Sequence, residues 1–180
     1  ITATPQHTTE SILNLLRDRR GSAGEDIGFN NRGAINAWIG AHLAVANLDE
    51  RIVYVCEPSH GLGLARAFGI DGSVQRDPLP ASLDLSVHER HMIRYLAARE
   101  RARAALPRDR SAAAAASAEM LALNPNGFEA HWLAGLASDD PIRRRQELER
   151  ALELQPPYRS DREMITRQLS DVTTQPSATR

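Results

Sequence analysis

A thiol, a carboxylate and an imidazole lie within the five residues from Cys56 to His60. They follow the β-branched segment Arg51–Cys56, which predicts a strand, and functional residues often lie where such an element gives way to a loop. A cysteine thiolate beside a histidine is a nucleophile, so Cys56 and His60 are the candidate catalytic residues. The competing interpretation is that Cys56 is a small, buried hydrophobic residue. We favour a non-catalytic chain, although the sequence leaves its status as an enzyme open.

Two glycine-marked loops are candidate anion sites. The polar loop Glu25–Arg32 precedes a predicted helix, whose first amides favour an anion together with Arg32, so Asn30, Asn31 and Arg32 are candidate ligand-binding residues. The polarity of a surface loop explains the same residues equally well. The second loop, His60–Ala65, resembles a phosphate-binding turn, but it has two glycines rather than three, and no acidic strand end follows it. This loop predicts a tight turn into a helix.

A basic face lies on a helix predicted to begin near Ser86. At 100° per residue, Arg90, Arg94 and Arg101 fall within about 40° of one another. Residues 88–110 contain seven arginines against three acidic residues, a balance that suits an acidic partner or a phosphate. The competing interpretation is a solvated face that pairs with glutamates of neighbouring helices.

Metal ligands are sparse in this chain. A single cysteine excludes an internal disulfide framework and any zinc site built on several thiolates. His88 and His91 are three residues apart on the predicted helix and could face one ion, but no third ligand accompanies them. We therefore predict neither a metal site nor a cofactor.

Composition bounds the class of the 180-residue chain. Apolar residues make up 42% and aromatic residues only 4%, so the core must be built from Ala, Leu, Ile and Val. A net charge of −1 excludes the globally basic balance of many nucleic-acid binders, and we expect no nucleic-acid partner. The sequence contains no run of 18 apolar residues, so we expect no membrane span within it. The chain begins with Ile1, so we expect a fragment or a processed product, with a membrane link only through segments outside it.

Residues 1–80 predict a small mixed α/β part. The expected elements are a helix from Thr8 or Thr9 to about Arg20, a helix over Arg32–Leu48, one clear strand over Arg51–Cys56 and a short helix over Gly61–Phe68. A single strand is not stable alone. Its partner is therefore the segment Ser73–Arg76, another chain, or sequence outside this one, and edge pairing with a second copy makes a homodimer a candidate.

Residues 81–172 predict an almost purely helical part, followed by a flexible tail over residues 173–180. Prolines and capping residues delimit its elements. The expected helices run from Ser86 to about Leu106, Ser111 to Leu123, Gly127 to Ala137, Pro141 to Leu154 and Tyr158 to about Val172.

The strongest pattern in this part is an internal repeat. Met120–Pro125 (MLALNP) matches Ala151–Pro156 (ALELQP) at an offset of 31 residues, and Phe128–Ala137 (FEAHWLAGLA) lies between them. A helix that ends in Ala-Leu-x-Leu-x-Pro, followed by Glu-Ala and then Leu-x-Gly-x-Ala, resembles the tetratricopeptide repeat. The resemblance covers about residues 86–172, and its period is three residues shorter than the usual 34. The alternative is an unrelated array of helical hairpins with similar stop signals.

The resemblance implies a mainly α fold, in which antiparallel helical hairpins follow the small α/β part. Such arrays form curved surfaces, lined on the inner side by the first helix of each pair, and bind proteins or peptides. In that register Glu129, Trp132, Leu136 and Asp139 face the groove. Trp132 is the expected anchor, since tryptophan is enriched at binding hot spots, and ordinary core packing is the competing interpretation.

We therefore expect a bacterial scaffold module that holds a protein or peptide partner. The alternative is the soluble extramembrane domain of a bacterial membrane glycosyltransferase or an O-antigen-ligase-like protein. This chain resembles, in general terms, the soluble helical-repeat tails that such membrane proteins often carry. The compartment stays open between the bacterial cytoplasm and the periplasm.

Overall fold

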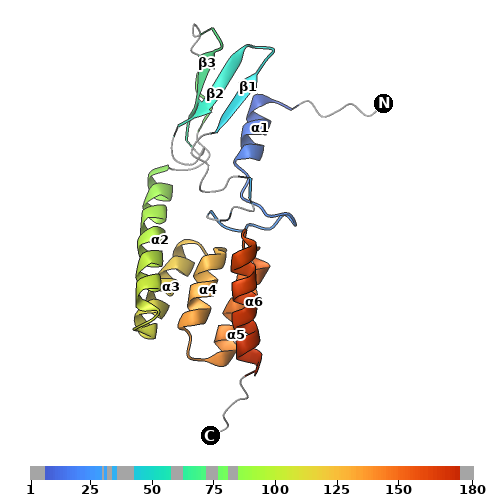
Figure 1. The fold of residues 1–180 in the computed structure, drawn as a ribbon. Coiled ribbons are helices and arrows are strands. Elements are labelled where there is room, and N and C mark those ends of the chain that lie inside the picture. Colours follow the sequence, from blue (N-terminus) through green and yellow to red (C-terminus); the bar gives the residue numbers. More distant parts are fainter. Residues whose placement is uncertain are drawn as a thin grey trace, which may run out of the picture.

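The computed structural model describes residues 7–29, 31, 34–35, 43–57, 63–71, 77–80 and 85–174. Within these residues the fold is mainly helical, with six helices and a three-stranded antiparallel sheet in the N-terminal part. The predicted fold class is thereby confirmed. In Figure 1 the sheet and the first helix lie at one end of the molecule, and the five later helices lie at the other.

The five later helices form the array that carries the candidate site. They are α2 (Leu85–Ala105), α3 (Arg110–Leu123), α4 (Phe128–Ala137), α5 (Pro141–Glu153) and α6 (Arg159–Thr174). Each begins and ends within two residues of its predicted position, because local signals set the ends. Asp109 accepts a hydrogen bond from the amide of Ala112, and Asp140 caps α5, in which Pro141 comes first. Helix α6 extends into the predicted tail, and residues 175–180 lie outside the described ranges.

Consecutive helices of the array pack against one another and run antiparallel (Figure 1). Alanine permits this close packing, as the sparse aromatic content predicts: Ala98, Ala102, Ala113 and Ala130 are fully buried. Gly135 brings α4 onto α5, since a Cβ atom at this position would lie 3.0 Å from Cγ of Leu148.

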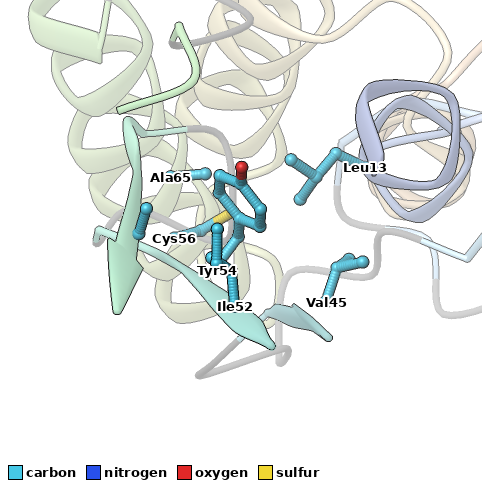
Figure 2. Close-up of a cluster of buried hydrophobic side chains, with 7 residues drawn as sticks. Leu13, Val45, Ile52, Tyr54, Cys56 and Ala65 are labelled. Atoms are coloured by element: carbon cyan, nitrogen blue, oxygen red, sulfur yellow. The ribbon is translucent and has the colours of Figure 1, made fainter. Parts of the chain in front are cut away.

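The N-terminal part is a helix packed on one face of a sheet. Strands β1 (Ala44–Asn47), β2 (Ile52–Cys56) and β3 (Ala65–Gly69) form an antiparallel meander in that order. Helix α1 (Thr9–Leu16) begins after Thr8, whose hydroxyl accepts a hydrogen bond from the amide of Ser11. Figure 2 shows Leu13 of α1 facing the sheet, from which alternate side chains, including Tyr54, project into the core.

Two predicted helices are wrong where the structure has strands. The helix predicted over Arg32–Leu48 covers Ala44–Asn47, which is β1, and the helix predicted over Gly61–Phe68 covers most of β3. Both strands are rich in alanine, a strong helix former, but each pairs with β2, and such pairing overrides local propensity. The partner segment proposed for β2, Ser73–Arg76, lies outside the described residues. Because β2 pairs with β1 on one side and β3 on the other, it needs no strand from a second chain. The homodimer stays a prediction, but the unpaired strand no longer supports it.

Residues 20–29 and 31, which follow α1 in the chain, connect the sheet part to the array through their contacts. Gly28 has a φ of 79°, and a Cβ atom there would lie 2.6 Å from the side-chain oxygen of Asn124, so this position requires glycine. Phe29 contacts Tyr95 of α2 edge to face, with 5.3 Å between the ring centroids. The connecting segment therefore packs against α2 and against the turn that precedes α4.

Candidate functional site

A cavity of about 160 Å³ opens on the helical array, between helices α3, α4, α5 and α6. Its apolar lining comes from Leu136, Leu148 and Val172. Its polar and charged lining comes from Arg110, Arg144, Gln168 and Asp171. A concave surface with an apolar floor and a few polar groups is the usual form of a binding site.

Three of the four predicted groove residues converge on this cavity. Leu136 lines it directly. The indole Nε1 of Trp132 donates a 2.7 Å hydrogen bond to Oε1 of Gln168, and Asp139 accepts a 2.8 Å hydrogen bond from Nη1 of Arg110, so both contact cavity-lining residues. Trp132 and Leu136 are four residues apart on α4 and therefore share one side of that helix, whereas Asp139 lies beyond the end of α4, after the extended residue Ser138.

Trp132 also packs against the core, which was the competing interpretation of this residue. It is half-buried and packs against the core cluster of α4, α5 and α6 that contains Phe128, Leu148 and Ile165. The indole thus joins the core of the array to the polar side of the cavity, through Gln168.

Glu129, the fourth predicted groove residue, lies apart from the cavity. Its carboxylate pairs with Arg103 and lies 3.9 Å from Nη1 of Arg99, both on α2. Only 6% of the residue is exposed. Burial raises the pKa of Glu129, the two arginines oppose that shift, and the nearby charge of Asp161 on α6 adds to it. Glu129 is therefore largely removed from solvent, and its ion pairs with Arg103 and Arg99 join α4 to α2.

Arg144 is a site residue that the sequence reasoning missed. It belongs to a run of three arginines near the start of α5, in which Arg143 lies 3.9 Å from Glu147 and Arg145 lies 2.8 Å from Glu149. Arg144 instead turns back to the end of α4, where its Nε and Nη2 donate to the carbonyl of Ser138 at 3.1 and 2.6 Å.

A sequence signal for this difference exists. The flanking arginines each have a glutamate four residues later, the spacing that favours a helical ion pair, whereas position 148 is a leucine. Arg144 makes no ion pair with a carboxylate in the part of the chain that the structure describes. Its charge is thus left at the wall of the cavity.

The candidate catalytic pair is not assembled among the described residues. Cys56 is 7% exposed and belongs to the core cluster between α1 and the sheet (Figure 2). Nη2 of Arg17 lies 3.8 Å from its Sγ and donates to the carbonyl of Gly63 at 2.7 Å. His60 lies outside the described residues. The geometry favours the interpretation of Cys56 as a packed core residue.

The predicted ligand loop contributes a helix cap. Asn31 is fully buried, and its Nδ2 donates to the carbonyls of Leu154 at 2.6 Å and Gln155 at 3.1 Å, just beyond the end of α5. Both donor hydrogens of the amide are therefore used within the protein. Asn30 and Arg32, the other residues of this candidate site, lie outside the described ranges.

The basic face pairs largely with α3. Arg94 and Arg101 lie 3.4 and 2.5 Å from the carboxylate of Glu119, while Arg90 is exposed. This arrangement matches the interpretation of a solvated face that pairs with a neighbouring helix. His91 is exposed, and the side chain of His88 is outside the described set. No group of three potential metal ligands gathers among the residues that the structure places.

A wider hollow of about 580 Å³ lies between the start of α1 and β1, lined among others by Glu10, Asn47 and Asp49. It contains none of the predicted site residues. The cavity on the array is therefore the candidate site that the sequence and the structure share.

Neither membrane-spanning helices nor comparisons with known proteins assign a function to the cavity. None of the helices within the described ranges has the length and apolarity needed to cross a bilayer. No protein-family model, no curated protein and no solved structure matches the chain.

Proposed function

We propose that the helical array is a protein- or peptide-binding module, which holds a segment of its partner at the cavity on α3 to α6. The observation that carries the proposal is convergence: Leu136, the Trp132–Gln168 pair and the Arg110–Asp139 pair come from α3, α4, α6 and the turn after α4, and they meet at one cavity. The lining combines apolar carbons with hydrogen-bonding groups, the combination by which proteins recognise side chains.

The repeat pattern supports this proposal. The equivalent turns Asn124-Pro125 and Gln155-Pro156 precede α4 and α6, and consecutive helices pack in chain order as in a stacked array. Membership in the tetratricopeptide-like class is part of the proposal. The alternative function, an extramembrane domain of a bacterial membrane glycosyltransferase or O-antigen-ligase-like protein, stays a prediction.

Selection of peptides from a random displayed library tests the proposal. We expect peptides enriched on the full chain to lose binding to Leu136→Gln, which places an amide in the apolar floor. Binding to the control variant Arg150→Gln should persist, because Arg150 pairs with Glu153 on the outer side of α5 and does not line the cavity. Far-ultraviolet circular dichroism checks that both variants are folded. Peptides that bind wild type and Leu136→Gln equally well would refute the cavity as the binding site.

A further inference from the structure

One of the two arginines that line the cavity, Arg144, has no carboxylate partner among the described residues. Of its charged lining residues, Arg110 and Arg144 are cations and Asp171 is an anion. Arg144 is half-buried, and its two described hydrogen bonds go to a neutral carbonyl rather than to a carboxylate. A partly desolvated guanidinium without a counter-ion is unfavourable, so an anionic group that enters the cavity gains the pairing that the chain itself omits.

The second arginine is held by a partner that is easily displaced. Arg110 pairs with Asp139, and the two side chains are 52% and 81% exposed. Ion pairs this exposed contribute little to stability. A carboxylate from another molecule can therefore replace Asp139 on Arg110 at small cost, and Asp139 marks the place where that carboxylate sits.

The apolar floor limits what carries the negative charge. The cavity that the two arginines line is also lined by three aliphatic side chains, Leu136, Leu148 and Val172. Burial of an aliphatic group against them is favourable, whereas a bare inorganic anion gains nothing from that surface. The volume of about 160 Å³ suits a few side-chain groups of a partner rather than a whole helix or strand.

We propose that the cavity selects partner segments in which an aspartate or glutamate adjoins an aliphatic side chain. This inference rests on the proposed function. The aliphatic side chain packs between Leu136 and Val172. The carboxylate pairs with Arg144 and replaces Asp139 on Arg110.

The test uses 4-methylpentanoate, which joins an aliphatic group to a carboxylate, and its uncharged analogue 4-methylpentanamide. Binding to the full chain is followed by NMR, through the Trp132 indole and the arginine Nε–H signals. We expect the carboxylate to bind about tenfold more tightly than the amide, as one charge-assisted hydrogen bond provides. Asp139→Asn, which removes the internal competitor, should bind the carboxylate more tightly than wild type.

Matched variants assign the effect to Arg144. Arg144→Gln should weaken 4-methylpentanoate binding by about tenfold. Arg145→Gln, which alters the adjacent arginine paired with Glu149, should leave it unchanged. If Arg144→Gln is unfolded by circular dichroism, Arg144→Lys takes its place and should retain most of the binding, because it keeps the positive charge.

Several outcomes would overturn the inference. Equal binding of the acid and the amide would do so, as would equal losses in the Arg144 and Arg145 variants. Inorganic phosphate that binds as tightly as 4-methylpentanoate would show a simple anion site. If library peptides need Leu136 but are neutral, the carboxylate preference fails while the binding function stands; if they do not need Leu136, the binding function fails as well.

Discussion

Replacement of Gly135 by alanine probes the close contact between α4 and α5 on which the cavity depends. The new methyl group would lie 3.0 Å from Cγ of Leu148, 3.1 Å from its Cδ2 and 3.2 Å from the carbonyl oxygen of Arg144. Leu148 is fully buried and Arg144 contributes backbone, so neither can move away freely. Both residues line the cavity, and a shift of α5 would change its shape.

Two effects of opposite sign determine the size of the change. Alanine is favoured over glycine inside a helix by about 1 kcal/mol. Insertion of a methyl group into a well-packed core costs about 1–3 kcal/mol. We therefore expect a net loss of about 1 kcal/mol in the free energy of unfolding, which lowers the Tm by about 2–4 °C for a chain of this size.

Urea unfolding followed by circular dichroism measures this loss, with Ala115→Gly on the exposed side of α3 as the control for helix propensity. In a Leu148→Ala background the same glycine substitution should become less harmful, with a coupling energy of about 1 kcal/mol between the two positions. If Gly135→Ala instead stabilises the protein by as much as Ala115→Gly destabilises it, α4 and α5 do not approach closely at this point, and the packing that shapes the cavity is wrong.

The remaining predictions concern two buried polar groups and the thiol. Because burial raises the pKa of Glu129 above its ordinary value of 4.5, the folded chain holds that proton more tightly than the unfolded chain, so wild-type stability falls as the pH rises through the interval above 4.5. Glu129→Gln lacks this contribution, and its stability relative to wild type should increase from pH 4 to pH 7; a constant difference in urea unfolding would contradict it. Asn31→Ala removes two hydrogen bonds to the end of α5 and should cost about 2 kcal/mol, whereas a loss below about 0.5 kcal/mol would mean that this cap is not formed. Cys56 should react with iodoacetamide at neutral pH only as fast as the N-terminal part opens, since it is 7% exposed; rapid labelling of the folded chain would restore the candidate nucleophile.

The helical half of the fold could be read from the sequence because its signals are local. Pro141 at the first turn of α5 and Pro156 before α6 act within a few residues of themselves, and the side chain of Asp140 caps the helix that follows it. The match between the MLALNP and ALELQP turns is likewise visible without coordinates. The sheet could not be read in this way. Ala44–Asn47 and Ala65–Gly69 contain good helix formers, and only their hydrogen bonds to β2 make them strands.

The candidate site divides along the same line. The register of the repeat resemblance predicted Trp132, Leu136 and Asp139 as groove residues, and the helical period keeps Trp132 and Leu136 on one side of α4 because that geometry is a property of a single helix. Tertiary packing decided what they face: Arg110, Arg144 and Gln168 reach the cavity from three other helices, and no local pattern relates residues so far apart in the chain. Glu129 shares the same predicted face, but the approach of α2 draws its carboxylate toward Arg99 and Arg103 instead. The sequence by itself determined which residues occupy each helical face, and only the packing of α3 to α6 decided which of those faces form a cavity. The reason is that a cavity depends on distances between elements and not on the order of residues within one.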